Sequence, residues 1–266
     1  MDIQGENTKQ YFDLIMAELQ YLEEFDKLQE NKELGEALMN TILGTEGPRT
    51  VSSPPSPRSV FVANKLFRPL GEIIDSLSNI HNIAIYVNSF PYRRQRVSRV
   101  AYLRYHIESY YEEIYILKER LIAYLTAITR AYRKSDRAKV VKEGLGPLFS
   151  IVSNTLKAYV DRRGAHVHVA RYSDGDIDRL STLELLSSQQ GRLAETLAPL
   201  YHEAYRSVRR TWHRRIKDDL AALDNLIDAY FERVLACTIV DGRLVYPDVD
   251  QAAQQGAAAD AAKRRG

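Results

Sequence analysis

The sequence has little of several features that mark whole classes of protein. A single cysteine, Cys237, excludes an internal disulfide framework and any cysteine-rich zinc module. No run of about 18 uncharged apolar residues occurs, which argues against a membrane-spanning helix and against a membrane as partner. Residues 1–8 are polar and acidic and lack a basic or apolar leader. These absences predict a soluble protein of the cytoplasm, where a lone thiol stays reduced.

The short motifs of several enzyme classes are also missing. The chain has no glycine-rich phosphate loop, no Gly-x-Ser-x-Gly turn, no His-Glu-x-x-His pair and no Cys-x-x-Cys pair. P-loop, serine-hydrolase and zinc-protease chemistry therefore have no support in the sequence. The formal net charge is only +2, but residues 1–46 hold eleven acidic residues and three lysines. The rest of the chain therefore carries a net charge of +10, so most of the protein is basic.

Apolar residues recur at steps of three and four over most of the chain, which is typical of amphipathic helices. The pattern predicts a helix that is capped by Thr8 and weakens toward Gly44, and further helices over residues 70–87, 96–134, 139–160 and 181–236. We expect an interruption at Gly144, Gly146 and Pro147 and another near Gly191 or Pro199. Within residues 96–134 the steps form an unbroken heptad seam of Val100, Leu103, Ile107, Tyr110, Ile114, Leu117, Leu121, Tyr124, Ile128 and Ala131.

The segments between these helices have the composition of loops and turns. Residues 45–59 are rich in proline and serine and predict a loop, residues 174–176 predict a turn, and Asp241-Gly242 predicts a short C-terminal β-hairpin. Residues 1–7 predict a flexible N-terminus, and the Ala- and Gln-rich residues 250–266 predict a disordered tail. The expected fold is an all-α bundle of four to five long helices with a long central helix, in a single domain over residues 8–249.

The most informative motif follows the predicted helix over residues 139–160. Arg162 and Arg163 are followed by His166 and His168, and the intervening Gly164 allows the chain to turn sharply. Two structural explanations stay open. Cations and histidines favour the carbonyl end of a helix, and a His-x-His pair can bind a metal, with residue 161 or 174 as a further carboxylate ligand.

An arginine that is followed after four to six residues by a histidine, at a helix end in a helical bundle, resembles the signature of the HEPN superfamily. Arg163 and His168 have four residues between them, and Arg162 and His168 have five. Two other pairs with this spacing lie inside predicted helices. The resemblance extends loosely over residues 60–236 and includes the segment Tyr-His-Ile-Glu at residues 105–108.

The resemblance implies a metal-independent endoribonuclease that needs no cofactor. Arg163 would then stabilise charge on the phosphate, and His168 would serve as acid or base at the ribose 2′-hydroxyl and the leaving 5′-oxygen. Arg162 and His166 are supporting candidates for the same site. The resemblance also implies a homodimer with a composite RNA groove, and a role in toxin-antitoxin systems or phage defence, with an antitoxin or other regulatory partner.

A second candidate surface lies in the predicted helix over residues 181–236. We define the basic stripe as Arg206, Arg209, Arg210, His213, Arg214 and Lys217. Like charges one helical turn apart repel, so the stripe favours a counter-charge such as an RNA phosphate backbone or the acidic residues 1–46. The nearby Tyr201, Tyr205 and Trp212 could stack on bases, although aromatic residues at helical spacing more often form the core.

Two alternatives to catalysis stay open. The chain could be a noncatalytic HEPN-like module that binds RNA or a nucleotide through the basic stripe. It could also be a structural protein in which the heptad seam pairs helices of two copies. Salt-dependent RNA binding would separate these two alternatives.

Overall fold

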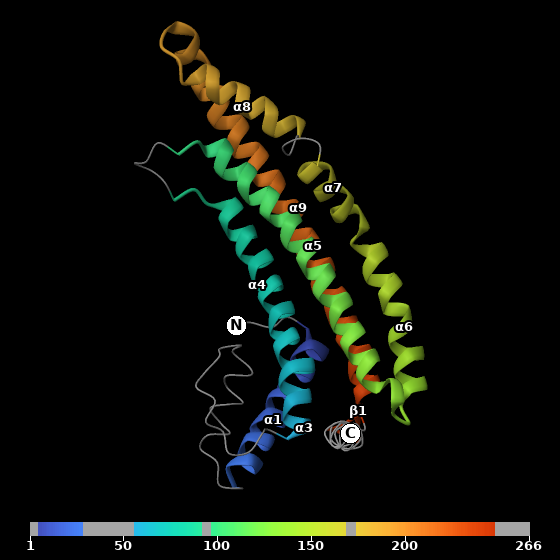
Figure 1. Cartoon of the computed structure of the whole chain (residues 1–266). Helices are drawn as coiled ribbons and strands as arrows, with labels where there is room; N and C mark the ends of the chain where they lie inside the picture. Colours follow the sequence, from blue (N-terminus) through green and yellow to red (C-terminus); the bar gives the residue numbers. More distant parts are fainter. Residues whose placement is uncertain (1–4, 29–55, 92–96, 169–173, 248–266) are drawn as a thin grey trace, which may run out of the picture. The chain divides into compact units, whose positions relative to one another are not determined.

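The computed structural model describes residues 5–28, 56–91, 97–168 and 174–247, and for residues 23–28 and 164–168 it describes the backbone alone. Almost all of this described backbone is helical, which confirms the all-α fold class (Figure 1). The expected helical continuation toward Gly44, most of the predicted loop 45–59 and the tail 250–266 lie outside the described residues. No helix in the described part of the chain has the length and apolar character that a membrane crossing needs.

The helices of the described ranges are α1 (Glu6–Leu28), α3 (Pro57–Phe61), α4 (Arg68–Asn88), α5 (Arg99–Ala131), α6 (Ala138–Thr155), α7 (Lys157–His168), α8 (Gly175–Ser187) and α9 (Arg192–Thr238). A π-helical turn, Val62–Phe67, joins α3 to α4, and a 3₁₀ turn, Tyr132–Lys134, follows α5. Strands β1 (Ile239–Val240) and β2 (Arg243–Leu244) come last. The predicted helices over residues 70–87 and 96–134 are thus confirmed as α4 and α5.

The chain divides into two compact units. Unit 1 consists of Met1–Ile74, Arg120–Val152 and Asn225–Gly266, and unit 2 consists of Asp75–Glu119 and Ser153–Asp224. Helices α4, α5, α6 and α9 contribute segments to both units, whereas α7 and α8 belong to unit 2. The boundaries of a single domain over residues 8–249 stay a prediction.

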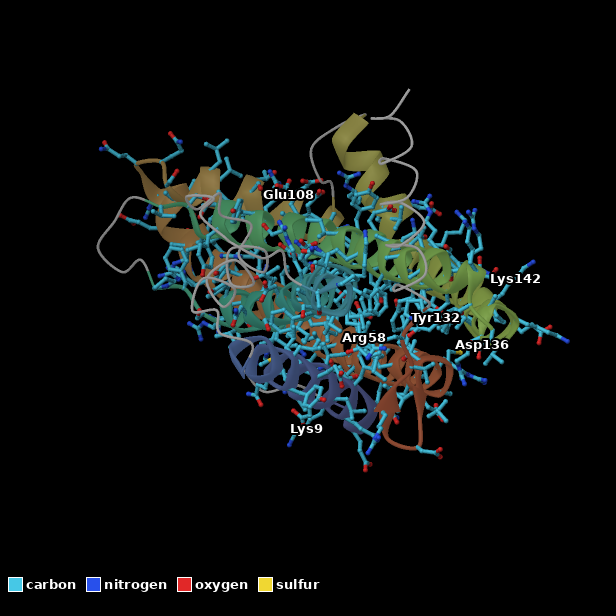
Figure 2. All side chains as sticks on the ribbon, turned by 60° about the horizontal axis from the view of Figure 1, so that its bottom comes forward. Lys9, Arg58, Glu108, Tyr132, Asp136 and Lys142 are labelled. Atoms are coloured by element: carbon cyan, nitrogen blue, oxygen red, sulfur yellow. The ribbon has the colours of Figure 1, made fainter. Side chains whose placement is uncertain are left out.

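The core of unit 1 is built around aromatic side chains. The Tyr11 ring stacks on Phe231 at 5.3 Å, and the buried Tyr11 and Tyr124 hydroxyls share a hydrogen bond of 2.8 Å. Pairing these hydroxyls removes most of the cost of burying them. Charged side chains such as Lys9 and Lys142 extend from the outer faces of α1 and α6 (Figure 2).

The heptad seam of α5 packs inside the chain. From Val100 to Ile128 its residues are each at most 2 % exposed. Burying one such aliphatic side chain contributes about 2 kcal/mol, so the seam holds α5 firmly in the core. Because the chain's own helices cover these residues, the seam leaves no free apolar face for a second copy.

Helix α1 begins earlier than the sequence predicts, and a residue far along the chain caps it. Thr8 lies inside the first turn, and its backbone N–H donates to Asp228 at 3.1 Å. The Thr8 hydroxyl and the Asn7 amide donate to the same carboxylate. The prediction that Thr8 is the cap is therefore wrong, because α9 supplies the acceptor. Residues 6 and 7 of the predicted flexible N-terminus are helical for the same reason.

Helix α6 continues through the positions where the sequence predicts an interruption. Pro147 lies inside α6, and the break comes at Leu156, before α7. The helix is anchored by buried Val141, Leu145 and Leu148. Gly144 serves a packing role, since a Cβ there would meet the Cys237 sulfur at 2.3 Å. Burial of one face thus outweighs the low helix propensity of glycine and proline.

Two segments with turn composition are helix starts. The Ser56 hydroxyl accepts from the Ser59 N–H and Pro57 opens α3, so the last three residues of the predicted loop 45–59 are helical. The Asp174 carboxylate accepts from the N–H groups of residues 176 and 177 and caps α8, which begins at Gly175. The predicted turn at residues 174–176 is therefore the first turn of a helix.

Two other predictions are confirmed, namely the helix break near Gly191 and the C-terminal β-hairpin. The chain between α8 and α9 reverses at Gly191, whose φ of +112° favours glycine, while Pro199 lies inside α9. The C-terminal hairpin pairs Ile239 with Leu244 around residues 241 and 242, both of which have positive φ.

Replacing Asp228 with alanine should lower the free energy of unfolding by about 1–2 kcal/mol near neutral pH, because three donors of the α1 start lose their acceptor. Burial opposes ionisation of Asp228, but the hydrogen bonds from Thr8 and Asn7 outweigh it and lower the pKa of this carboxyl below 3.8. A depressed pKa stabilises the fold above the value of the unfolded chain, and this stabilisation is lost as the pH falls through the folded pKa.

Urea unfolding at pH 7 and near pH 3 measures both effects. The difference between the wild type and Asp228→Ala should shrink at the lower pH. The exposed Asp13→Ala on α1 is the matched control and should change stability by less than about 0.5 kcal/mol. Equal losses for the two variants would contradict the capping role.

Candidate functional site

Helix α7 lies against α5 within unit 2 and brings both motif arginines to it. The Arg162 guanidinium donates to the Tyr111 hydroxyl at 3.0 Å. The Arg163 guanidinium makes two hydrogen bonds with the Glu112 carboxylate, at 2.7 and 3.1 Å, and lies 4.0 Å from the centre of the Tyr115 ring. The two adjacent arginines of the motif therefore occupy defined positions on one stretch of α5.

The charge of Arg163 is balanced by Glu112. The hydrogen bonds with this carboxylate raise the pKa of Arg163, against the opposing effect of burial. A two-pronged arginine–carboxylate pair has the same geometry as an arginine–phosphate pair. A phosphate could therefore reach Arg163 either through its remaining N–H donors or by displacing Glu112.

The two motif histidines lie at the end of α7. The backbone is helical from Gly164 to His168, so the predicted sharp turn at Gly164 is wrong. The side chains of both histidines lie outside the described residues. In a helix, positions four apart share a face, whereas positions five apart differ by about 140° around the axis. Position 166 thus shares a face with position 162, and position 168 is turned away from position 163.

The carboxylates considered as metal ligands beside the histidines have other partners. Asp161 forms an ion pair with Lys157 at 2.5 Å, and Asp174 caps α8. Among the side chains that the structure describes, no three from His, Cys, Asp and Glu gather as a metal site.

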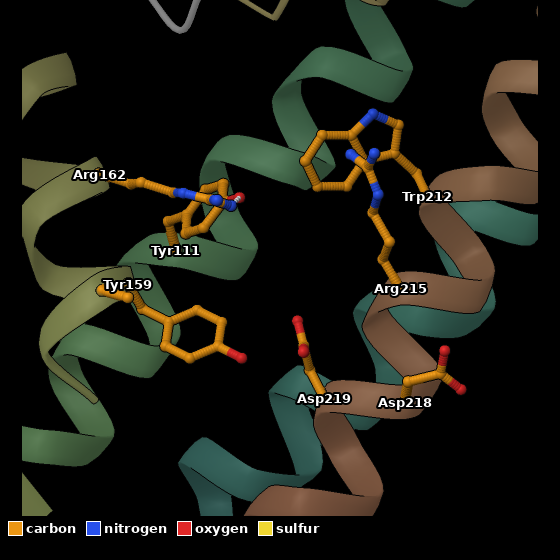
Figure 3. Close-up of a pocket in the computed structure, with 8 residues that line it drawn as sticks. Tyr111, Tyr159, Arg162, Trp212, Arg215, Asp218 and Asp219 are labelled. Carbon is orange, nitrogen blue, oxygen red and sulfur yellow. Dashed lines mark hydrogen bonds between the residues drawn. The ribbon is translucent and has the colours of Figure 1, made fainter. Parts of the chain in front are cut away.

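A pocket of about 490 Å³ lies beside Arg162 in unit 2. Its lining comes from α5, α7 and α9 and consists of Tyr111, Ala158, Tyr159, Arg162, Trp212, Arg215, Asp218 and Asp219. Figure 3 shows Arg162 entering from α7 on one side and Arg215 from α9 on the other, with the Asp219 carboxylate between them. The pocket therefore combines aromatic walls with charges of both signs, as small-molecule sites do.

Two of the charged groups in this pocket are held in place by tyrosine and tryptophan. The Tyr110 hydroxyl donates to Asp219 at 2.6 Å, and the Arg215 guanidinium lies 5.1 Å from the Trp212 ring centre. Burial and a hydrogen bond with Asp219 raise the pKa of Tyr159 to about 12, so this hydroxyl stays protonated and can donate. The polar groups are thus oriented before any ligand arrives.

The basic stripe lies on α9, with most of its charge facing solvent. Arg206, Arg210, Arg214 and Lys217 are exposed, and Arg209 is half-buried with its guanidinium 6.0 Å from the Tyr205 ring centre. Burial, followed by the charges of Lys217 and Arg209, lowers the pKa of His213. His213 is therefore neutral near pH 7, and the permanent charge of the stripe comes from its arginines and lysine.

The aromatic residues near the stripe belong to the core. Tyr201, Tyr205 and Trp212 are at most 5 % exposed, so the core interpretation is confirmed and none of them offers an open stacking face on the stripe. Sequence reasoning did not identify Glu112, Tyr159 or Asp219 as residues of the candidate site. For two of them the spacing is a signal that could have found them. Tyr159 precedes Arg162 by one helical turn, and Asp219 follows Arg215 by one turn.

No protein-family model, no curated protein sequence and no solved structure matches the chain. The residues of unit 2 and the arginine–histidine spacing in α7 are therefore the features from which we infer a function.

A double-mutant cycle on Arg163→Ala and Glu112→Ala should show a coupling of about 0.5–1 kcal/mol in the free energy of unfolding. The pair is two-pronged and only partly exposed, which favours a measurable coupling. The exposed pair Lys139 and Glu143, 4.0 Å apart, is the control and should couple near zero. Strict additivity at Arg163 and Glu112 would contradict the pairing. Chemical denaturation of the single and double variants provides the measurement.

Proposed function

We propose that the protein is a metal-independent endoribonuclease of the HEPN type. The observation that carries this proposal is the pair of guanidinium groups on α7 that α5 holds in place, with the two motif histidines four and six residues after Arg162 along the same helix. The arginines supply positive charge for a phosphate, and the histidines supply groups that titrate near neutral pH.

The chemistry needs no group from outside the protein and the RNA. A neutral imidazole of His166 or His168 takes the proton of a ribose 2′-hydroxyl, and the 2′-oxygen attacks the adjacent phosphorus. The bond to the 5′-oxygen breaks, and this oxygen takes a proton from a second imidazole. The products are a 2′,3′-cyclic phosphate and a free 5′-hydroxyl. DNA lacks the nucleophile and is not cleaved.

The arginines have different parts in this proposal. Arg162 is exposed beside the pocket and can bind the substrate phosphate directly. Arg163 can supply further positive charge, because a phosphate that replaces Glu112 would form a two-pronged contact with the Arg163 guanidinium. A ligand must therefore compete with Glu112 for Arg163, which favours ligands that carry two aligned anionic oxygens.

The proposal includes a second copy of the chain. One copy holds two arginines and two histidines, and a homodimer would gather both sets around one RNA strand. We further propose a cytoplasmic location and a role as a toxin or defence effector, restrained by an antitoxin or other regulatory partner.

The second candidate function is RNA binding without cleavage through the basic stripe. The observation that favours it is the exposure of four permanently charged side chains on α9, none of which forms an ion pair within 4.0 Å with a carboxylate in the described part of the chain. This function would hold even if the α7 site were inactive.

The purified protein should cleave RNA that contains single-stranded loops in the presence of excess chelator, and a 2′-deoxy substitution at the cleaved nucleotide should block the reaction. Arg162→Ala, Arg163→Ala, His166→Ala and His168→Ala should each reduce the cleavage rate, with a loss of about 10²-fold or more for the histidine that serves as base. Gel analysis of end-labelled RNA provides the rate and the product ends.

Two exposed residues provide matched controls for this assay. Arg179→Ala on α8 and His202→Ala on α9 remove the same chemical groups elsewhere in unit 2 and should leave the rate within about twofold. Cleavage that persists in both motif-histidine variants would exclude the α7 site as its source.

Neutralising the stripe should weaken RNA binding and its dependence on salt. The triple variant Arg206→Gln, Arg210→Gln, Arg214→Gln removes three cations, which for single-stranded RNA should reduce the slope of log K against log salt by about 2. The exposed set Arg133→Gln, Lys134→Gln, Lys142→Gln removes the same charge from unit 1 and should leave the slope unchanged. Failure of the wild type to shift RNA at low salt would contradict both functions and favour a structural role.

A further inference from the structure

The proposed cleavage does not use the part of the pocket that α9 forms. Trp212, Arg215 and Asp219 follow one another at steps of three and four, so they share one face of α9. This face presents a guanidinium and a carboxylate side by side at the pocket. Figure 3 shows Asp219 directed into the space between Tyr159 and Arg215.

Both groups are oriented by contacts that leave bonding capacity free. The Tyr110 hydroxyl donates to Asp219, and the nearby Asp219 contributes to the raised pKa of Tyr159, but a carboxylate has about four acceptor sites, so acceptors remain for a ligand. The contact of Arg215 with the Trp212 ring is a cation–π contact and not a hydrogen bond, so the N–H groups of the guanidinium are available to a ligand. A planar ligand that enters the pocket therefore meets paired donors from Arg215 and acceptors from Asp219.

Guanine fits this arrangement better than the other three RNA bases. It carries two neighbouring acceptors, O6 and N7, which match an arginine fork, and two neighbouring donors, N1–H and N2–H, which match a carboxylate. Residues four apart on a helix have Cβ atoms about 5–6 Å apart, a separation that the donor and acceptor edges of one purine can span. Adenine offers an acceptor where the carboxylate needs a donor, and neither pyrimidine has an O6 and N7 pair.

We propose that this pocket binds guanine, with Arg215 on O6 and N7, Asp219 on N1–H and N2–H, and the base beside the Tyr159 ring. Arg162, on the opposite side of the pocket, binds the phosphate of the same nucleotide. Resting on the proposed function, the pocket gives the ribonuclease a preference for a guanosine next to the cleaved bond. The same chemistry is present in a free guanine nucleotide, so the test contains both ligands.

Trp212 provides a direct measurement, because it is the single tryptophan of the chain and lies under Arg215. Titration with GMP should change its fluorescence, and AMP, CMP and UMP should bind at least about tenfold more weakly. A second series uses single-stranded RNA hexamers with one guanosine or none. Tighter binding of the guanosine hexamer than of GMP supports RNA as the natural ligand, and the reverse order assigns the pocket to a free nucleotide.

Variants connect the signal to the proposed contacts. Arg215→Gln should weaken GMP binding about tenfold or more, and Asp219→Asn should remove the preference for GMP over AMP, since an amide cannot accept as a carboxylate does. Arg179→Gln on α8 is the matched control and should bind GMP like the wild type. Because Asp219 accepts from Tyr110, circular dichroism must show a folded Asp219→Asn. If the Asp219→Asn variant is unfolded, the binding of the four nucleotides to Arg215→Gln provides the test.

The outcomes separate this inference from the proposed nuclease. Equal binding of all four nucleotides, or an absence of any fluorescence change up to millimolar GMP and with both hexamers, would overturn the guanine pocket even if RNA cleavage is observed. Selective GMP binding by a protein that does not cleave RNA would support the pocket and contradict the nuclease.

Discussion

The organisation of unit 2 depends on the contacts of Tyr110 and Tyr111 on α5. Both rings are buried in the core, and both hydroxyls make directional hydrogen bonds, one to Asp219 on α9 and the other with Arg162 on α7. Hydrophobic burial fixes how close the helices lie, but it is not directional. The two hydroxyl bonds add the direction, and they set which residues of α7 and α9 line the pocket.

Helix α9 uses its cations in two different ways. Arg215 lies on an aromatic ring beside a carboxylate, so its position is defined. The exposed cations of the basic stripe repel one another at steps of four residues, and they gain most when an external anion approaches. The two proposals therefore use different faces of the helix, one for a small planar ligand and the other for an extended polyanion. RNA is a ligand that offers both features in one molecule.

The sequence predicts the helices well where one physical signal dominates. The heptad seam predicts α5 and Asp241-Gly242 predicts the hairpin, because the spacing of apolar residues and the residue types of a turn are local properties of the sequence. The predictions failed where a distant residue decides the local structure. The start of α1 depends on Asp228, and the path of α6 depends on the buried face that carries it past Pro147.

The same distinction applies to the candidate site. The arginines and histidines of α7 and the stripe of α9 could be singled out from residue type and spacing. The partners that give them defined positions, Glu112 for Arg163 and Tyr110 for Asp219, lie about 50 and 110 residues away in the chain. No local pattern connects such pairs, so only the fold reveals that the motif arginine is already occupied by a carboxylate.

This occupancy bears on which anions unit 2 can bind. A ligand that takes Arg163 must supply at least as much as Glu112 does, namely two aligned oxygens close to the guanidinium. Free inorganic phosphate offers the oxygens but nothing for the pocket or the stripe, so under the proposed function we expect it to displace the carboxylate less readily than RNA does. An RNA strand places a phosphate, a base and further phosphates at fixed separations, so in the proposed function its contacts with α7 and α9 would form together. Under the proposed function, the internal ion pair would therefore favour a polynucleotide over a single anion, because only a polynucleotide offsets the loss of the Glu112 contact with several new ones.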